Sequence, residues 1–170
     1  HYEEGDSAAV LEHAARAQTV VIGPGLGRHP DTGKFVRRVL EGLSSMDTSL
    51  VIDADALFHC TREGLSIRGL RGVLTPHPGE AASMLGCSTL EVQDARFASV
   101  EALQSRYGGV VLLKGAGTLI YDGTHGRIVP RGTPYLATGG SGDVLSGIIA
   151  SCMSKEGLRD FDATVAGAYI

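Results

Sequence analysis

Short apolar runs alternate along this chain with longer segments in which apolar residues recur at helical spacing. Runs typical of buried β-strands occupy residues 19–23, 49–53, 72–75 and 109–113. Helical spacing is found over residues 7–17, 31–43, 78–86 and 89–107, and again from Asp143 onward. This alternation predicts an α/β fold with a mostly parallel central sheet that is covered by helices on both faces.

Two further apolar runs, at residues 118–123 and 127–129, have no helical segment between them. They flank Asp122-Gly123-Thr124-His125-Gly126, which is rich in turn-forming residues. This pattern predicts an antiparallel hairpin after the parallel strands.

Four polar or glycine-rich motifs directly follow the predicted parallel strands. They are residues 23–27, 53–55, 75–80 and 114–118. Parallel α/β sheets bind their ligands at the carboxyl ends of the strands. We therefore expect the four motifs to meet at one edge of the sheet and to form one site there.

The composition is that of a single globular domain over residues 1–170. The chain is 43% hydrophobic and has a net charge of −4, which is enough apolar material for a sizeable core. No apolar run reaches the about 18 residues of a membrane span, and the charged first residues do not resemble a secretion signal, so we expect a cytoplasmic protein with no membrane partner. The absence of Lys/Arg clusters argues against nucleic acid and favours a small ligand.

The cysteines are odd in number and far apart, at Cys60, Cys87 and Cys152. They form no CxxC pair, so neither a disulfide framework nor a zinc site is predicted. We expect three free thiols in the core or near the surface.

Residues 137–147 place an acid at the point where a glycine-rich loop becomes a helix. The residues at the predicted first turn are Gly139, Gly140, Ser141 and Gly142. The unpaired N–H groups of such a turn and the positive end of its dipole bind anions. An acid there without a basic neighbour would repel a phosphate, but it suits a base that accepts a proton during phosphoryl transfer. The alternative is that Asp143 only stabilises the helix dipole.

The sequence Gly23-Pro24-Gly25-Leu26-Gly27-Arg28 resembles part of a dinucleotide-binding fingerprint. The GxGxxG pattern requires glycine where Arg28 stands, and Pro24 lacks the N–H that a pyrophosphate loop uses. Although Asp53 ends the next strand as a ribose-binding acid would, we expect a turn shaped for the close approach of a ligand and not a nicotinamide-dependent Rossmann site.

Asp53 and Asp55 lie two residues apart at the end of the second predicted strand. Carboxylates at this spacing suit water-mediated Mg²⁺ binding or proton chemistry. Either of them is equally suited to cap the helix that begins near Ala56. Both interpretations stay open.

Two prolines hold His77 in an extended conformation, and Pro78 suits the first position of a helix. This rigid frame makes His77 a candidate hydrogen-bond donor to a substrate, the alternative being a solvated or purely structural histidine. No second ligand lies at metal-binding spacing from it.

Lys114 stands between a strand and two glycines, in a motif that is not a Walker loop because no Gly-Lys-Ser/Thr opens a helix there. We interpret it as a phosphate-binding cation. The alternative is a lysine that only extends along the sheet edge.

Taken in order, GPGLGR, VIDADAL, TPHPGE, LKGAGT and ATGGSGDVLSG resemble the motifs of the ADP- or ATP-dependent NAD(P)H-hydrate dehydratases of the ribokinase-like superfamily. The GxGD element is shared with ribokinase-like kinases, whereas TPHPGE and VIDADAL point to the dehydratases. The resemblance implies ribokinase-like αβα layers around a doubly wound sheet. It also implies that hydrated NADH or NADPH is converted back to NAD(P)H through phosphorylation of its hydroxyl and loss of phosphate.

Carried over by this resemblance, Asp143 is the base that contacts and deprotonates the substrate hydroxyl, and Gly139, Gly140, Ser141 and Gly142 form the anion hole. Gly27 and His77 contact the hydrated dinucleotide. The residues that contact ADP or ATP are Lys114, Gly115, Ala116, Gly117, Thr118 and Gly142. Mg²⁺ bridges the nucleotide phosphates with no protein side chain assigned as its ligand. The family also implies a homo-oligomer and an epimerase that is fused upstream or acts as a partner.

The chain departs from the family pattern in three places. No glycine-rich βα segment precedes residue 19, the family domain continues beyond residue 170, and residues 131–136 lack the expected Asn- and Gly-rich sequence. The chain also begins without Met and stops inside a helical pattern, so we expect a domain that is truncated at both its N- and C-terminal ends.

Two other functions stay open beside the dehydratase. One is a ribokinase-like small-molecule kinase, of the type that acts on the hydroxymethyl group of a vitamin precursor, which would release a stable phosphorylated product. The other is a non-catalytic nucleotide-binding module, which would not depend on Asp143 for any turnover. The sequence does not decide between ADP and ATP, since both use the same loop contacts.

Overall fold

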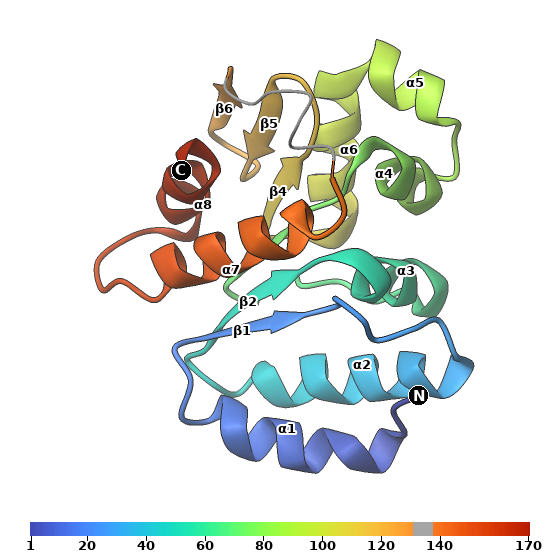
Figure 1. Ribbon diagram of the computed structural model, residues 1–170, viewed down its shortest axis with the longest axis vertical. Coiled ribbons are helices and arrows are strands. Elements are labelled where there is room, and N and C mark those ends of the chain that lie inside the picture. Colours follow the sequence, from blue (N-terminus) through green and yellow to red (C-terminus); the bar gives the residue numbers. More distant parts are fainter. Residues whose placement is uncertain (131–137) are drawn as a thin grey trace.

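A central sheet lies between two layers of helices in the computed structural model, which describes residues 1–130 and 138–170 (Figure 1). The described strands follow one another across the sheet in sequence order. The parallel strands are β1 (Thr19–Ile22), β2 (Ser49–Ile52), β3 (Gly72–Leu74) and β4 (Val110–Leu113). The predicted hairpin continues the sheet as the antiparallel strands β5 (Thr118–Tyr121) and β6 (Gly126–Val129).

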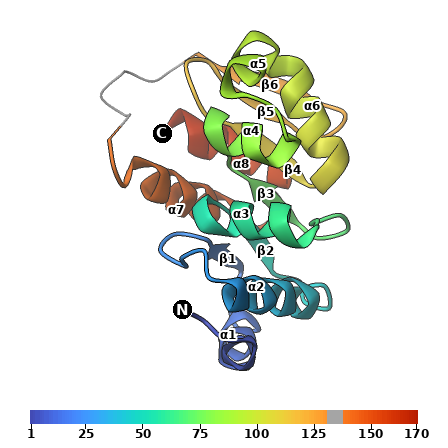
Figure 2. The same ribbon diagram turned by 90° about the vertical axis from the view of Figure 1, so that its right-hand side faces the viewer.

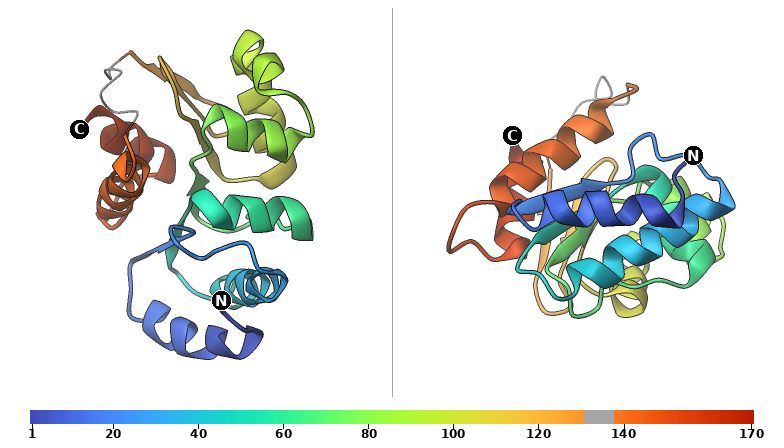
Figure 3. Two further views of the ribbon diagram at one scale, coloured as in Figure 1. Left: turned by 45° about the vertical axis from the view of Figure 1, so that its right-hand side comes forward. Right: turned by 90° about the horizontal axis from the view of Figure 1, so that it is seen from below.

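Figure 3 shows the connecting helices on one face of the sheet and the two last helices on the other. The first layer holds α2 (Pro30–Leu43), α3 (Ala54–Glu63), α4 (Pro78–Leu85), α5 (Thr89–Asp94) and α6 (Arg96–Tyr107), with α1 (Ser7–Ala14) against α2. The second layer holds α7 (Ser141–Met153) and α8 (Asp160–Tyr169). None of the described helices is long and apolar enough to cross a membrane.

The expectation of a doubly wound sheet is not met in the described residues. Double winding requires the strand order to reverse, whereas here each parallel strand is added on the same side of the one before it. Right-handed crossovers that advance in one direction place all their helices on one face. The second face is therefore covered by α7 and α8, which follow the hairpin.

Alternate residues of the strands enter two separate cores. Leu50 and Ile52 of β2 pack under the connecting helices, whereas Val51 between them packs under α7 and α8. All three side chains are at most 1% exposed. Burial on both faces explains why the strands read as continuous apolar runs and not as alternating ones.

The segment predicted as one helix over residues 89–107 is two helices. Ser88 and Glu91 form a capping box that starts α5, as the sequence predicts. At Ala95 the backbone leaves the helical region, with φ −127° and ψ 48°, and α6 begins anew at Arg96. Helical spacing of apolar residues continues across the break, so the apolar pattern does not indicate where the helix is interrupted.

The three cysteines are free, as predicted. Cys60 and Cys152 are buried and Cys87 is half-buried. Burial raises the pKa of the Cys60 thiol to about 12, which keeps this thiol protonated and unreactive at neutral pH.

Candidate active site

Three of the four strand-end motifs meet beneath the start of α7. Lys114 Nζ, after β4, donates to Asp53 Oδ1, after β2, at 2.9 Å. Ser146 Oγ on α7 donates to Asp53 Oδ2 at 2.8 Å. Glu80 of α4 adds a second carboxylate, with its Oε2 at 3.9 Å from Lys114 Nζ. This confirms that the motifs converge on one edge of the sheet.

Asp53 is a buried carboxylate that stays charged. Its residue is only 2% exposed, and burial by itself would raise its pKa. The charge and hydrogen bond of Lys114, with hydrogen bonds from Ser146 and Thr75, outweigh burial and hold the pKa of Asp53 below its usual value. The Asp53 carboxylate is therefore ionised at neutral pH.

In the structure, the side chains of Asp53 and Asp55 bind groups outside α3. No side-chain hydrogen bond caps α3, and the Asp53 oxygens are bonded to Lys114 and Ser146. Asp55 instead accepts from the backbone N–H of Gly27 and from Arg28 Nε, each at 2.9 Å. The first carboxylate positions a lysine and the second holds the loop after β1.

The start of α7 has the open, glycine-rich form that an anion site requires. Gly140 is the N-cap residue in the left-handed region, with φ 87°. A side chain at Gly139 or Gly140 would meet nothing within 4 Å, whereas a Cβ at Gly142 would lie 3.5 Å from Lys114 Nζ. The Lys114 ammonium thus adjoins the first turn, where the local sequence has no cation. Asp143 is the third residue of α7 and is exposed.

The loop between β4 and β5 surrounds the guanidinium group of Arg96, the first residue of α6. Arg96 donates to the backbone carbonyl oxygens of Leu113, Lys114 and Gly117 at 3.2–3.5 Å. Gly115 and Ala116 at its tip are exposed. The predicted nucleotide contacts at residues 114–118 therefore form one ordered, accessible loop.

The loop after β1 is held by α3. Besides the bonds to Asp55, the carbonyl oxygen of Gly27 lies 2.8 Å from Nε2 of the fully buried His59. A Cβ at Gly23 would lie only 1.7 Å from the carbonyl oxygen of Asp53. Glycine at position 23 is thus required by the close approach of the chain to itself, whereas Gly25 and Gly27 are open.

His77 begins α4 and is also available to a ligand. Its Nδ1 accepts from the N–H groups of Gly79 and Glu80 at 3.0 and 3.2 Å. A neutral imidazole that accepts at Nδ1 carries its proton on Nε2, so Nε2 is a hydrogen-bond donor. His77 and Arg28 line the same groove of about 240 Å³. It lies between α3 and α4, which are side by side in Figure 2. The structure thereby brings the loop of Gly27 and His77 to one groove.

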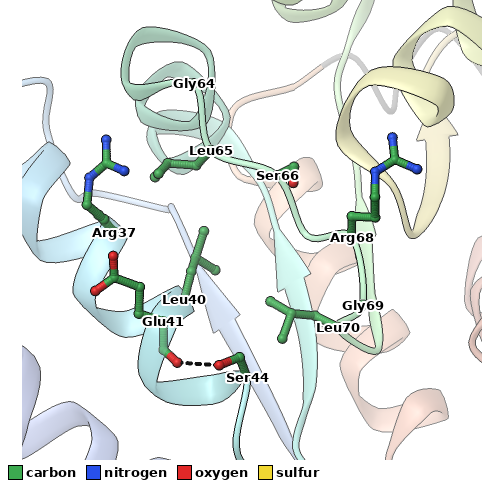
Figure 4. Close-up of a pocket in the computed structure, with 10 residues that line it drawn as sticks. All are labelled: Arg37, Leu40, Glu41, Ser44, Gly64, Leu65, Ser66, Arg68, Gly69 and Leu70. Atoms are coloured by element: carbon green, nitrogen blue, oxygen red, sulfur yellow. Dashed lines mark hydrogen bonds between the residues drawn. The ribbon is translucent and has the colours of Figure 1, made fainter.

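A larger pocket of about 490 Å³ lies away from these residues (Figure 4). It is formed by α2 and the loop between α3 and β3, at the amino ends of the strands. Arg37 and Arg68 stand on opposite sides of it, and their guanidinium groups donate to Glu63 and to the carbonyl oxygen of Ser105. No predicted site residue lines this pocket.

Four contributing residues were not predicted as site residues. Ser146 and Glu80 lie within motifs quoted above. Each follows a predicted site residue, Asp143 or His77, by three positions, and residues at this spacing share a helix face. This spacing could have indicated both residues. Arg96 and His59 stand inside helical patterns that carry no such signal. Residues 131–136, where the sequence departs from the family pattern, and Ala137 lie outside the described residues. The ligand-binding roles assigned to individual residues stay predictions.

The described sheet has six strands in sequence order. The helices that connect its strands cover one face, and α7 and α8 cover the other. This arrangement is that of a ribokinase-like αβα protein. A ribokinase-like superfamily protein from Enterococcus faecalis matches it with a TM-score of 0.82 and 26% identity, covering 98% of this chain and 57% of that chain. The family model of the NAD(P)H-hydrate dehydratases matches residues 1–170, and the chain belongs to that family.

Named relatives agree with this membership. The chain is 43% identical over 151 residues to the bifunctional NAD(P)H-hydrate repair enzyme of Vibrio cholerae, covering 89% of this chain and 29% of that protein. An ADP/ATP-dependent NAD(P)H-hydrate dehydratase from Bacillus subtilis, co-crystallised with ATP and Mg²⁺, has 29% identity and a TM-score of 0.77, with coverage of 94% and 57%. The chain therefore spans less than a third of the curated relative.

Proposed function

We propose that the protein containing this chain is an ADP- or ATP-dependent dehydratase that returns hydrated NADH or NADPH to NAD(P)H. The observation that carries the proposal is the position of Asp143 on the first turn of the glycine-capped helix α7, next to the Asp53–Lys114 pair. A base and an anion site at one helix start are what phosphorylation of a hydroxyl requires.

In the proposed reaction the O–H bond of the substrate hydroxyl breaks and its proton passes to the Asp143 carboxylate. The freed oxygen forms a bond to the terminal phosphorus of the nucleotide, whose bond to the remaining nucleotide breaks. Backbone N–H groups of residues 139–142 stabilise the negative charge of the transferring group. Phosphate, a better leaving group than hydroxide, then departs as a neighbouring carbon loses a proton, which restores the ring double bond.

The described residues fit a nucleotide whose Mg²⁺ is held mainly by its own phosphates. In residues 1–130 and 138–170, three metal-ligand side chains come close enough together only at His1, His29 and Asp31, at the start of α2. At the proposed site, Asp53 is already bonded to Lys114 and Ser146. When bound, the ion would neutralise phosphate charge. Lys114 and the loop 114–118 would hold the nucleotide.

The test uses the full-length protein with hydrated NADH, Mg²⁺ and either ADP or ATP. We expect the absorbance of the dihydronicotinamide ring to return, with release of inorganic phosphate, only when a nucleotide is present. Parallel assays with ADP and ATP identify the donor. Failure of the absorbance to return with both donors would reject the dehydratase. Accumulation of a stable phosphorylated product would instead indicate a ribokinase-like kinase.

Further parts of the proposal concern the whole protein. We propose that residues 1–170 are a single, partial domain, that the protein self-associates, and that an epimerase is fused to it or acts with it. The description of the Vibrio cholerae relative as bifunctional supports a second activity outside the 29% of its length that this chain covers. The three free cysteines support a reducing compartment such as the cytoplasm.

A further inference from the structure

Arg96 stands at a position that is unfavourable for a cation. It is the first residue of α6, where the positive end of the helix dipole repels a positive charge. The helical pattern over residues 89–107 would have placed it inside one continuous helix, but the break at Ala95 gives it a helix start of its own. Within the described part of the chain, no carboxylate lies at ion-pair distance from it. Its charge must be compensated in another way.

Backbone carbonyl groups provide that compensation. Nη2 of Arg96 lies 3.3 Å from the carbonyl oxygen of Leu113 and 3.2 Å from that of Gly117. Nη1 lies 3.4 Å from the carbonyl oxygen of Lys114. A planar guanidinium with several fixed donors can join three acceptors, which a single ammonium group cannot do in the same plane. The strand end and the loop are thus gathered around one side chain.

This arrangement dictates how the loop presents its own donors. All described peptide bonds are trans, so each N–H points away from the carbonyl group of the preceding residue. Because the Lys114 carbonyl faces Arg96, the N–H of Gly115 faces away from it. Gly115 has a φ of 136°, and a Cβ there would lie 2.9 Å from Nη1 of Arg96. Glycine at this position and arginine at position 96 are therefore matched to each other.

We propose that Arg96 is a positioning residue for nucleotide binding. By drawing the carbonyl groups of Leu113, Lys114 and Gly117 together, it holds the loop in the form that directs a backbone donor outward and leaves the Lys114 side chain beside α7. Arg96 touches no reacting atom. The inference rests on the proposed function, since it takes the loop 114–118 as the nucleotide contact.

The test measures binding of ATP, with Mg²⁺, to the full-length protein and to Arg96→Ala, Arg96→Lys and Arg106→Ala variants. Arg106 is the matched control because it lies at the other end of α6 and also donates to a backbone carbonyl, that of Met84 at 2.8 Å. We expect both Arg96 variants to raise the Kd for ATP about tenfold or more, because hydrogen bonds from a charged group are lost. The Arg106 variant should leave it within about twofold.

The kinetic readout separates positioning from general damage. Arg96→Lys keeps the charge and tests the carbonyl contacts even if Arg96→Ala folds poorly. We expect its KM for the nucleotide to rise with kcat nearly unchanged at saturating nucleotide. Folded Arg96 variants that bind ATP as tightly as the unmodified protein would overturn this inference alone. An unmodified protein that binds no ATP would reject the proposed nucleotide site and this inference together.

Discussion

At the scale of single residues, the Asp53–Lys114 pair shows how the site is kept charged inside the protein. The Asp53 side chain is 2% exposed and that of Lys114 is 20% exposed, so neither charge is well solvated. Removal of one partner leaves the other uncompensated, which costs more than the pair contributes when intact. The pair therefore links the stability of the fold to the geometry around the first turn of α7.

Asp53→Asn should lower the free energy of unfolding at pH 7 by about 3 kcal/mol. The pKa of Asp53 is lowered in the folded protein, so its carboxylate stabilises the fold at pH values above about 4 and loses this effect as the pH falls through the lowered pKa. The stability difference between variant and unmodified protein should shrink in acid. Urea unfolding from pH 7 to pH 3 measures it, with the exposed Asp94→Asn as control. An equal difference at every pH would contradict the prediction.

Asp143→Asn should abolish turnover while the Kd for ATP changes by no more than a few-fold. A lost general base lowers the rate by about 10²–10⁴-fold, whereas the backbone N–H groups of residues 139–142 are kept. Steady-state turnover and equilibrium binding provide the two measurements, again beside Asp94→Asn. If Asp143 only stabilises the helix dipole, the variant will keep its turnover and lose about 0.3–1 kcal/mol of stability.

At the scale of elements, one residue at the start of α4 is both a helix cap and a proposed substrate contact. His77 caps the helix through Nδ1, and Glu80 closes the capping box by accepting from the backbone N–H of His77 at 2.8 Å. The opposite ring nitrogen, Nε2, lies 3.6 Å from Oε1 of Glu80, and the His77 side chain is 55% exposed. The helix cap and the proposed substrate contact therefore use different atoms of the same ring.

Asparagine at position 77 should separate the two functions. Asn is a good N-cap residue, so His77→Asn should keep stability within about 0.5 kcal/mol, whereas His77→Ala should lose about 1 kcal/mol. Both variants lose the Nε2 donor and should raise the KM for the hydrate. Ser88→Ala, which removes the cap of α5, is the control that lowers stability alone. An unchanged KM in both His77 variants would remove His77 from the substrate site.

At the scale of the whole molecule, two cores share one sheet. Neighbouring residues of β2 belong to different cores, so neither core can form without the strands that complete the other. Cys60 lies in the core beneath the connecting helices and Cys152 in the core beneath α7 and α8. Each face of the sheet therefore has one buried cysteine, and labelling of its thiol reports the exposure of that core.

Both buried thiols should become reactive at the same urea concentration. Shared strands make the two cores one cooperative unit, and the half-buried Cys87 should be the thiol that reacts in the native protein. Thiol labelling with mass spectrometry in a Cys87→Ser background, followed against urea, measures the two transitions. Labelling of Cys152 well before Cys60 would show that the α7–α8 layer unfolds on its own.

Local patterns of the sequence determined the strands, most helices and the edge at which the motifs meet. Apolar periodicity, turn residues and helix caps act over a few neighbouring residues, so they can be read without knowing what lies across the sheet. The capping box at Ser88 and the helix start at Pro78 are of this kind.

Only the tertiary structure decided which side chains become partners. Asp53 meets a lysine 61 residues away and a serine 93 residues away, and the break at Ala95 turns Arg96 onto a loop 18 residues further on. Such contacts depend on the order and register of strands and on which helix face points inward. The sequence alone predicted where a phosphate site would lie, and long-range packing decided which charges surround that position.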